Sequence, residues 1–430
     1  MNATNASRFT DHAGRPLIAV TGLGVITSLG TGVEENWRRL VAGESGIHPI
    51  GRFPTEGLAT RVAGTVEWIS GDQADTETIT RSLAIAAADE AIAGSGLPGS
   101  AFGGPLFLAA PPVEPEWPQR LALAQGGDFP REDTYPALLD AATAHPRDDY
   151  YAAVCFASIA DTLADRYGIS GVPVTLSTAC ASGATAVQLG VEAIRRGETT
   201  HALVVGADGS TTAEALIRFS LLSAITTQNE PPEKAARPFS KNRSGFVMAE
   251  GAGALVLETL ESAVARGATI HGVILGCGEK ADDFHRTRTS PDGGPAIAAV
   301  RAALADAGLS DQDIDYVNAH GTSTPENDKM EYLTLSTVFG DRVASLPVSS
   351  NKSMIGHTLS AAGAIEAVIS LLSLKHGILP PTINYDEPYP AIPLDVVPNT
   401  ARPAPIRTVL SNSFGFGGQN ACLVLGRDPS

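Results

Sequence analysis

The sequence predicts a layered α/β protein with a duplicated core. Short apolar runs typical of buried strands alternate with helical patterns along the 430 residues, and this order implies helices packed on the faces of a sheet. A first series ends with the apolar run that reaches Leu257, and a second series begins near Thr269. Because the chain is long enough to bury more than one core, we expect two halves, residues 1–268 and 269–430.

Composition and charge narrow the class of partner. Hydrophobic residues make up 43% and charged residues 18% of the chain, which is typical of a globular protein rather than a disordered one. With 30 basic and 47 acidic side chains the formal net charge is −17, so we do not expect nucleic acid as a partner. An acidic protein partner would have to bind a local basic patch.

The cysteines and the apolar segments predict a cytoplasmic protein. Cysteines stand at positions 155, 180, 277 and 422, and this irregular spacing matches neither a metal knuckle nor a redox CxxC pair. Residues 1–8 lack the apolar centre of a signal peptide, and no run reaches the ~18 apolar residues of a membrane span.

The first half begins with a predicted strand over residues 17–24. Its glycines Gly22 and Gly24 resemble the start of a dinucleotide-binding loop, but the next glycine is Gly30, so a turn is the better interpretation. Helical patterns then cover residues 31–40 and 80–95, and an apolar run predicts a strand over residues 105–109.

A proline-rich segment follows. Residues 110–118 hold four prolines, so they cannot form a regular helix or a central strand. We interpret the polar, turn-rich region from residue 111 to about 150 as an elaborated loop rather than a separate domain. A helix is expected over Tyr151–Tyr167.

A cysteine at a strand-to-helix turn is the first candidate for chemistry. An extended run from Val174 leads to Cys180, and a helix with apolar residues three to four positions apart ends near Arg196 and Gly197. The unpaired N–H groups and the dipole at a helix N-terminus favour a thiolate, so Cys180 is a candidate nucleophile. The alternative is an unreactive cysteine that fills space in the core.

Two histidines are candidates to act together with Cys180 in a reaction. His320 follows a predicted strand, and His357 precedes the apolar helical pattern of residues 361–375. Although an isolated histidine in a turn is usually structural, the end of a parallel strand is where α/β folds place their chemistry. Lys352 lies just before His357, and Glu366 on the following helix is placed to pair with it if the loop folds back, which would fix geometry rather than react.

The remaining elements continue the alternation and end in a glycine-rich turn. Apolar runs predict strands over residues 201–208, 245–257, near 270 and 314–318, and a helical pattern covers residues 296–307. Residues 412–420 form a glycine-rich turn between two strands. Glycines let a backbone N–H approach a substrate oxygen, as an oxyanion hole requires, and a simple hairpin turn is the alternative.

Four ordered segments together resemble the β-ketoacyl-acyl carrier protein synthases, in particular the elongating type I/II of the thiolase superfamily. These segments are Thr178-Ala-Cys180-Ala-Ser-Gly, Ala319-His320-Gly-Thr-Ser-Thr-Pro, Asn351-Lys352-Ser-Met-Ile-Gly-His357 and Ser413-Phe-Gly-Phe-Gly-Gly. The resemblance implies a thiolase-like, duplicated αβαβα fold and a homodimer. It implies a 3-oxoacyl synthase of fatty acid biosynthesis, which condenses acyl and malonyl thioesters carried on the phosphopantetheine of an acyl carrier protein.

The resemblance also assigns the reacting groups. Cys180 would accept the acyl group, and the backbone N–H groups of Cys180 and Phe416 would hold the tetrahedral oxyanion. His320 and His357 would donate hydrogen bonds to the malonyl thioester carbonyl while carbon dioxide leaves, a role that suits neutral imidazole.

The supporting residues follow from the same resemblance. Thr322 and Thr324 would contact the pantetheine arm, and Lys352 and Glu366 would organise the site. Neither a metal nor a dissociable cofactor is expected, and the two histidines lack the local spacing of a zinc helix.

Three positions depart from the usual pattern of that family. Residues 110–117 stand in place of a glycine-rich segment of the acyl pocket, Asn327-Asp328 in place of Gly-Asp, and Gln419 in place of threonine. The preferred acyl chain is therefore not implied, and a specialised role in very-long-chain or lipid A-linked synthesis is a further hypothesis.

Two other functions stay open. One is a polyketide ketosynthase, and the other is a chain-length-factor-like subunit that forms a heterodimer with an active synthase and lacks a nucleophile, against which Cys180 argues. A CoA thiolase would need a second cysteine in the glycine-rich turn, and that turn has none.

Overall fold

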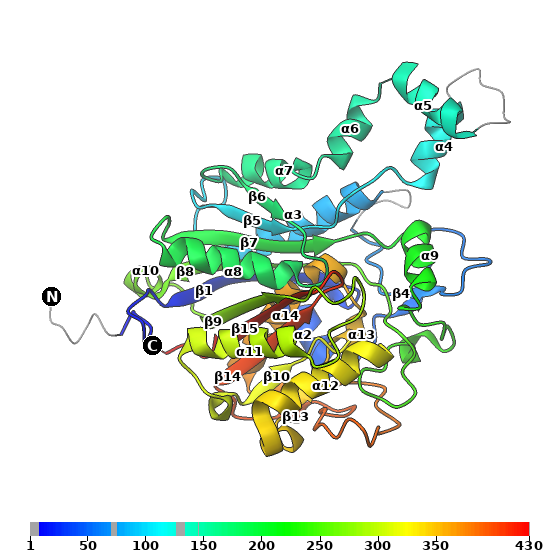
Figure 1. Cartoon of the computed structure of the whole chain (residues 1–430). Helices are drawn as coiled ribbons and strands as arrows, with labels where there is room; N and C mark the ends of the chain where they lie inside the picture. Colours follow the sequence, from blue (N-terminus) through cyan, green and yellow to red (C-terminus); the bar gives the residue numbers. More distant parts are fainter. Residues whose placement is uncertain (1–7, 70–74, 126–133, 145, 430) are drawn as a thin grey trace.

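A mixed sheet runs through the molecule, which the computed structural model describes over residues 8–69, 75–125, 134–144 and 146–429. Its first half consists of β1 (Ile18–Thr27), β2 (Gly30–Thr31), β5 (Leu106–Ala109), β6 (Val174–Leu176), β7 (His201–Asp208) and β8 (Gly251–Thr259). Its second half consists of β9 (Gly272–Ala281), β10 (Tyr316–Asn318), β11 (Val348–Ser349), β14 (Thr408–Phe414) and β15 (Gln419–Gly426). The strand order is β11-β10-β14-β15-β9-β1-β8-β7-β5-β6, and β2 pairs with β1. Figure 1 shows this order from β6 near the top of the sheet down to β10.

The two halves of the sheet repeat one topology. In the first half β6, β5 and β7 are parallel and are followed by the antiparallel strands β8 and β1. In the second half β11, β10 and β14 are parallel and are followed by the antiparallel strands β15 and β9. Pairing of Ile18 with Ile274 joins the halves through β1 and β9. The duplicated core is therefore visible in the topology although no residue-level repeat is visible in the sequence.

Helices form three layers around the two halves of the sheet. The larger helices are α2 (Val33–Val41), α3 (Thr76–Ser95), α7 (Ser158–Tyr167), α8 (Ser182–Arg195), α9 (Ala213–Leu221), α11 (Gly294–Ala307), α12 (Pro325–Phe339) and α14 (Ala362–His376). Shorter ones are α10 (Leu260–Ala265) and α13 (Lys352–Ile355). The predicted helices over residues 31–40, 80–95, 296–307 and 361–375 correspond to α2, α3, α11 and α14, which confirms them.

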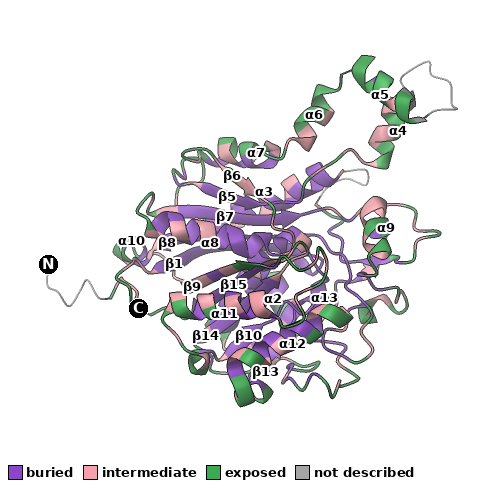
Figure 2. Ribbon diagram, in the orientation of Figure 1, coloured by how far each residue is buried: buried purple, intermediate pink, exposed green. Residues whose placement is uncertain are grey.

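Successive side chains of a strand point to opposite faces of the sheet, and this alternation explains the layers. In β7, Leu203 and Val205 pack with α3 and α7, whereas Val204 faces α8 and α14. In β15, Leu423 faces α8 and α14, whereas Val424 packs with α11 and α12. Helices α8 and α14 therefore form the middle of five layers, and Figure 2 shows the strands beside them as the most buried part of the molecule.

The central helices touch through glycines. A Cβ atom on Gly183 of α8 would lie 2.4 Å from the backbone nitrogen of Ala364, and one on Gly363 would lie 2.4 Å from that of Ala184. Both distances are too short for a real Cβ, so only glycine permits this approach. The stretch Leu359–His376 is long and apolar enough to cross a membrane, but 83% of it is buried inside the fold, as expected of a core helix.

The predicted turn at Gly22 and Gly24 is wrong. Both glycines lie inside β1, which continues to Thr27. Helix α3 crosses so closely that a Cβ on Gly22 would lie 2.0 Å from the carbonyl oxygen of Ala91, with an equally short contact between Gly24 and Ala87. The glycines thus permit helix-to-strand packing rather than a change of direction.

The predicted loop region over residues 111–150 is confirmed for residues 111–116, but it is wrong for the helices that follow. Helices α4 (Trp117–Gln125), α5 (Thr134–Ala144) and α6 (Asp148–Val154) form an arm that extends from the body (Figure 1). Pro118 is tolerated because it occupies the first turn of α4, where helix N–H groups have no partners. The helix expected over Tyr151–Tyr167 is interrupted at residues 155–157, so it is divided between α6 and α7.

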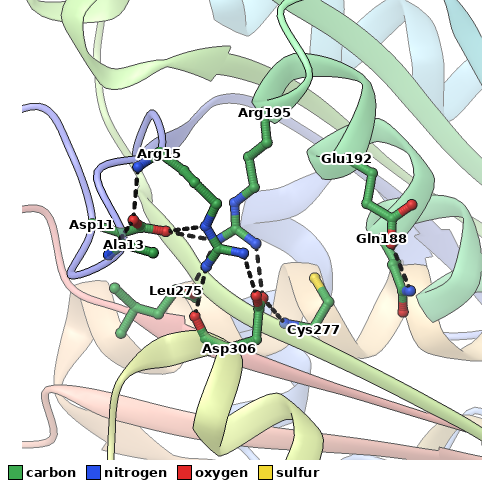
Figure 3. A network of polar contacts seen from close by, with 9 residues as sticks. All are labelled: Asp11, Ala13, Arg15, Gln188, Glu192, Arg195, Leu275, Cys277 and Asp306. Atoms are coloured by element: carbon green, nitrogen blue, oxygen red, sulfur yellow. Dashed lines mark hydrogen bonds and ion pairs between the residues drawn. The ribbon is translucent and has the colours of Figure 1, made fainter.

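A polar network fixes the C-terminal end of α8, the helix that follows Cys180 (Figure 3). Arg195 at the end of α8 donates to Asp306 of α11 at 2.7 Å, and Arg15 donates to the other oxygen of the same carboxylate at 2.6 Å. Asp306 also accepts the backbone N–H of Cys277 in β9 at 2.9 Å. The network joins the two halves at the end of α8 remote from Cys180.

Candidate active site

Cys180 lies at the start of the central helix α8. The residue before it, Ala179, has a φ of 49°, a left-handed conformation that is uncommon outside glycine and turns the chain sharply. Ser182 fixes this turn because its hydroxyl donates to the carbonyl of Ala179 at 2.6 Å and accepts the N–H of Thr178 at 2.8 Å. The side chain of Cys180 is partly exposed, and it opens into two cavities.

The electrostatics of Cys180 differ from the prediction. Burial raises the pKa of its thiol to about 11, although the backbone of Phe416 and the charge of Lys352 lower it. Burial therefore acts against the predicted preference for a thiolate. The Phe416 backbone and the Lys352 charge both favour negative charge on the sulfur.

His320 and His357 come together in the cavity that contains Cys180. Their ring centroids are 5.2 Å apart and the ring planes meet at 84°. His320 follows β10, and the backbone N–H of His357 donates to the carbonyl of Val247 at 2.7 Å. The cavity has a volume of about 400 Å³, and both rings and Cys180 line it.

Both imidazoles are neutral. Burial and the nearby charge of Lys352 hold the pKa of His320 and of His357 well below the usual range. The Nδ1 atom of each ring is enclosed and has no hydrogen-bond partner among the described residues. A neutral ring can donate a hydrogen bond to a substrate oxygen without carrying charge.

Lys352 and Glu366 form the pair that the sequence predicts. The Lys352 ammonium donates to the Glu366 carboxylate, and both side chains are almost fully buried. Burial raises the pKa of Glu366 to about 7, and the charge of Lys352 acts against this rise. Because Lys352 also lowers the pKa of Cys180, His320 and His357, its charge bears on every candidate reacting group.

Glu331 was not recognised from the sequence. This buried residue of α12 accepts the backbone N–H of His320 at 2.8 Å and that of Gly321 at 2.7 Å, and it also accepts the Asn412 side chain at 3.1 Å. One carboxylate thus connects the histidine turn to the start of the glycine-rich turn. The only signal in the sequence was its position three residues after Asp328, on the same buried face of a helix.

Thr322 and Thr324 also line the histidine cavity. Their hydroxyl oxygens are 2.9 Å apart, and Thr324 caps α12 by accepting the N–H of Asn327 at 3.2 Å. Asn327, which departs from the expected glycine, lines the cavity, whereas Asp328 is buried and accepts the N–H of Phe239 at 2.7 Å. Asp328 therefore stabilises the loop beneath the threonines and does not line the cavity.

The glycine-rich turn connects β14 to β15, as predicted, and carries Phe416. The backbone of Phe416 hydrogen-bonds to Cys180. Its ring lies 6.4 Å from that of Phe219, and both rings line both cavities. Cys180, His320, His357 and the Phe416 N–H thus converge in space. Among the described residues no group of three His, Cys, Asp or Glu side chains is arranged to hold a metal ion.

Comparisons with known proteins agree with this geometry. Residues 16–101 and 125–263 match the N-terminal domain described for β-ketoacyl synthases, and residues 271–386 match the C-terminal domain. The chain is 36% identical to 3-oxoacyl-[acyl-carrier-protein] synthase 2 of Coxiella burnetii over 95% of this chain and 98% of that relative.

Solved structures share the fold over nearly the whole chain. A type II polyketide synthase acyl-carrier protein in complex with its ketosynthase bound to the hexaketide matches with a TM-score of 0.85 and 31% identity, covering 96% of this chain and 100% of that chain. The ishigamide ketosynthase/chain length factor matches with a TM-score of 0.81 and 36% identity, covering 96% and 100% of the two chains.

Proposed function

The chain belongs to the β-ketoacyl synthase family, whose members are acyltransferases with a thiolase-like fold, and on this premise we propose its reaction and its catalytic residues. It is a 3-oxoacyl-[acyl-carrier-protein] synthase of fatty acid biosynthesis. It joins an acyl group held on Cys180 to a malonyl group held on the carrier. The observation that supports these roles best is the convergence of Cys180, two neutral histidines and the Phe416 N–H on one cavity.

In the first step Cys180 accepts the acyl group. Its sulfur attacks the thioester carbonyl, a new carbon–sulfur bond forms, and the bond to the pantetheine sulfur breaks. The proton that Cys180 loses is balanced by the proton that the departing pantetheine thiol takes up. The N–H groups of Cys180 and Phe416 stabilise the oxyanion, and loss of one such donor typically costs ~10²–10³ in rate.

In the second step His320 and His357 act together on the malonyl thioester. Each neutral ring donates a hydrogen bond to the thioester carbonyl oxygen, which carries the negative charge when carbon dioxide leaves. The resulting enolate carbon attacks the acyl carbonyl on Cys180, a carbon–carbon bond forms, and the Cys180 thiolate leaves. Thr322 and Thr324 contact the pantetheine arm, and Lys352 and Glu366 organise the groups around the sulfur.

The carrier and the assembly follow from the same proposal. The substrates arrive on the phosphopantetheine of an acyl carrier protein, and the enzyme uses no separate cofactor. It acts as a soluble cytoplasmic homodimer whose halves divide at residues 268 and 269. The structural relatives, an acyl-carrier protein complex and a ketosynthase/chain length factor, support a carrier partner and keep a heterodimer as the alternative assembly.

Mass measurement of the intact protein tests the proposal. Wild type and Cys180→Ala are incubated with acyl carriers of graded chain length. We expect a mass gain equal to the acyl group on wild type alone. Equal gain on both proteins would place the nucleophile elsewhere, and no gain with any carrier would favour the partner-subunit function.

A polyketide ketosynthase is the second candidate. Two observations favour it: the structural match to a polyketide ketosynthase, and charged side chains in the wall of the second cavity beside Cys180. Both candidates share the condensation and differ in the acyl chain. Product analysis after repeated condensation without reduction distinguishes them, because only a polyketide synthase would extend an unreduced chain.

A further inference from the structure

A second cavity meets the histidine cavity at Cys180. It has a volume of about 470 Å³, and Cys180, Phe219 and Phe416 line both cavities, whereas neither histidine lines the second one. In the proposed function the pantetheine arm occupies the histidine side. The acyl chain held on Cys180 therefore extends into the second cavity, and the inference below rests on that proposed function.

The wall of the second cavity is not uniformly apolar. Pro111, Pro112 and Val113 form an apolar part, but Asp208, Glu114, Glu116 and Glu214 also line it, together with Arg120 and Arg218. Four carboxylates thus stand against two guanidinium groups. Most of the wall is apolar, but a chain that covers one of these polar groups without a new hydrogen bond loses free energy.

Four of these six charged groups already have partners in the protein. Glu114 pairs with both Arg218 and Arg120, so the two arginines are engaged. Asp208 accepts the N–H and the hydroxyl of Ser210, and it also accepts the N–H of Ser360 at 3.0 Å. These groups form part of the wall without requiring a ligand.

Glu116 and Glu214 are different, because each has one oxygen fixed and one oxygen free. Oε1 of Glu116 accepts both the backbone N–H and the hydroxyl of Thr76 at 2.7 Å. Oε1 of Glu214 accepts the N–H of Trp117 at 2.6 Å. In the described part of the chain no residue hydrogen-bonds to either Oε2 atom. Both residues are half-buried and line the cavity, and the bonds to Oε1 hold each carboxylate in place.

We propose that this cavity selects an acyl chain that carries hydroxyl groups, with Glu116 and Glu214 as the specificity-determining residues. A hydroxyl donates a hydrogen bond to a free carboxylate oxygen and so replaces the water that the chain displaces. A saturated chain leaves the carboxylate unpaired, and an oxo group only accepts. A site built to bond a hydroxyl discriminates strongly against an analogue that lacks it.

The test measures how fast Cys180 is acylated by matched carriers. The acyl chains have equal length and are saturated, hydroxylated or oxo-substituted, with the substituent moved one carbon at a time along the chain. We expect one hydroxylated chain to load about tenfold faster or more than both the saturated chain and its oxo counterpart. Equal or faster loading of the saturated chain would overturn the inference.

Glu116→Gln makes the test specific. The amide oxygen of the new side chain can still accept the Thr76 donors, so the amide NH₂ would take the place of Oε2 and turn an acceptor into a donor. The variant should lose the preference for the hydroxylated chain and gain loading of the oxo chain. Glu214→Gln should change the preference in the same direction. This variant takes the place of Glu116→Gln in the test if Glu116→Gln fails to fold.

Glu34→Gln is the matched control, since Glu34 is exposed on α2 and lines neither cavity. It should keep the wild-type preference. The inference is wrong if the control and the Glu116 and Glu214 variants all behave as wild type. Failure of every carrier to acylate wild type would instead refute the proposed function, so the two failures are distinguishable.

Discussion

The carboxylate of Glu331 accepts the backbone N–H of His320 at 2.8 Å, and this bond fixes the turn from which the imidazole enters the site. The same carboxylate holds Gly321 and the Asn412 side chain. A residue on α12 that lines neither cavity thus positions His320 and the start of the glycine-rich turn.

Glu331→Gln should weaken both stability and catalysis. A glutamine has one acceptor oxygen in place of two, so one of the three donors that now bond to Glu331 would lose its partner. An unsatisfied buried donor costs about 1–3 kcal/mol of unfolding free energy. Urea unfolding measures the loss, and kcat for condensation should fall while acyl loading of Cys180 changes less. Unchanged stability and kcat would remove the positioning role.

Cys180→Ala should abolish condensation and leave the fold intact. Only one small, partly exposed side chain is lost, so the thermal midpoint should stay close to that of wild type. No acyl-enzyme should appear in the intact mass spectrum. Condensation that persists in this variant would mean that another group carries the acyl chain.

His357→Ala should impair malonyl decarboxylation more than acyl loading. Removal of one hydrogen-bond donor to a developing oxyanion typically costs ~10²–10³ in rate. Release of carbon dioxide from malonyl carrier is measured beside single-turnover acylation of Cys180. An equal loss in the two assays would contradict the role proposed for His357.

Asp328 should make stability depend on pH. Burial raises the pKa of this carboxyl to about 6 from an ordinary value of 3.8, although the Phe239 N–H and Arg243 lower it. The folded protein therefore holds the proton more tightly, so the contribution of Asp328 to stability is complete below pH 3.8 and is lost as the pH rises through 6.

Asp328→Asn provides the comparison, because asparagine resembles the protonated acid at every pH. The unfolding free energy of wild type minus that of the variant should fall by about 3 kcal/mol across this range. Denaturant unfolding at a series of pH values measures the difference. A difference that stays constant with pH, or rises with it, would show that Asp328 is ionised in the folded state.

Gly363→Ala should separate the two central helices. Its methyl group would lie 2.4 Å from the backbone nitrogen of Ala184, so α8 and α14 would have to move apart and displace the turn at Cys180. We expect a loss of several kcal/mol in unfolding free energy, as in severe overpacking, and a fall in acylation rate. Gly94→Ala on α3 has no atom within 4 Å of the new Cβ and should retain stability.

The sequence predicted those parts of the fold that depend on local patterns. The strand over residues 201–208 and the helices α2, α3, α11 and α14 were recognised because each has a continuous apolar period. The arm of α4, α5 and α6 was missed because its prolines suggested a loop, whereas Pro118 occupies a position where a helix accepts it. Gly22 and Gly24 were mistaken for a turn because the partner that requires them, α3, lies far away in the sequence.

The sequence by itself determined the family, the αβαβα architecture and the candidates Cys180, His320, His357, Lys352 and Glu366, because these depend on residue types in ordered motifs. The tertiary structure decided how the surroundings of each candidate residue shift its pKa. Burial raises the pKa of Cys180 against the effect expected of a helix N-terminus, and it keeps both histidines neutral. The roles of Glu331 and of the free oxygens of Glu116 and Glu214 also appear only in three dimensions. Burial and hydrogen bonding are set by neighbours from distant segments, and no local pattern encodes those neighbours.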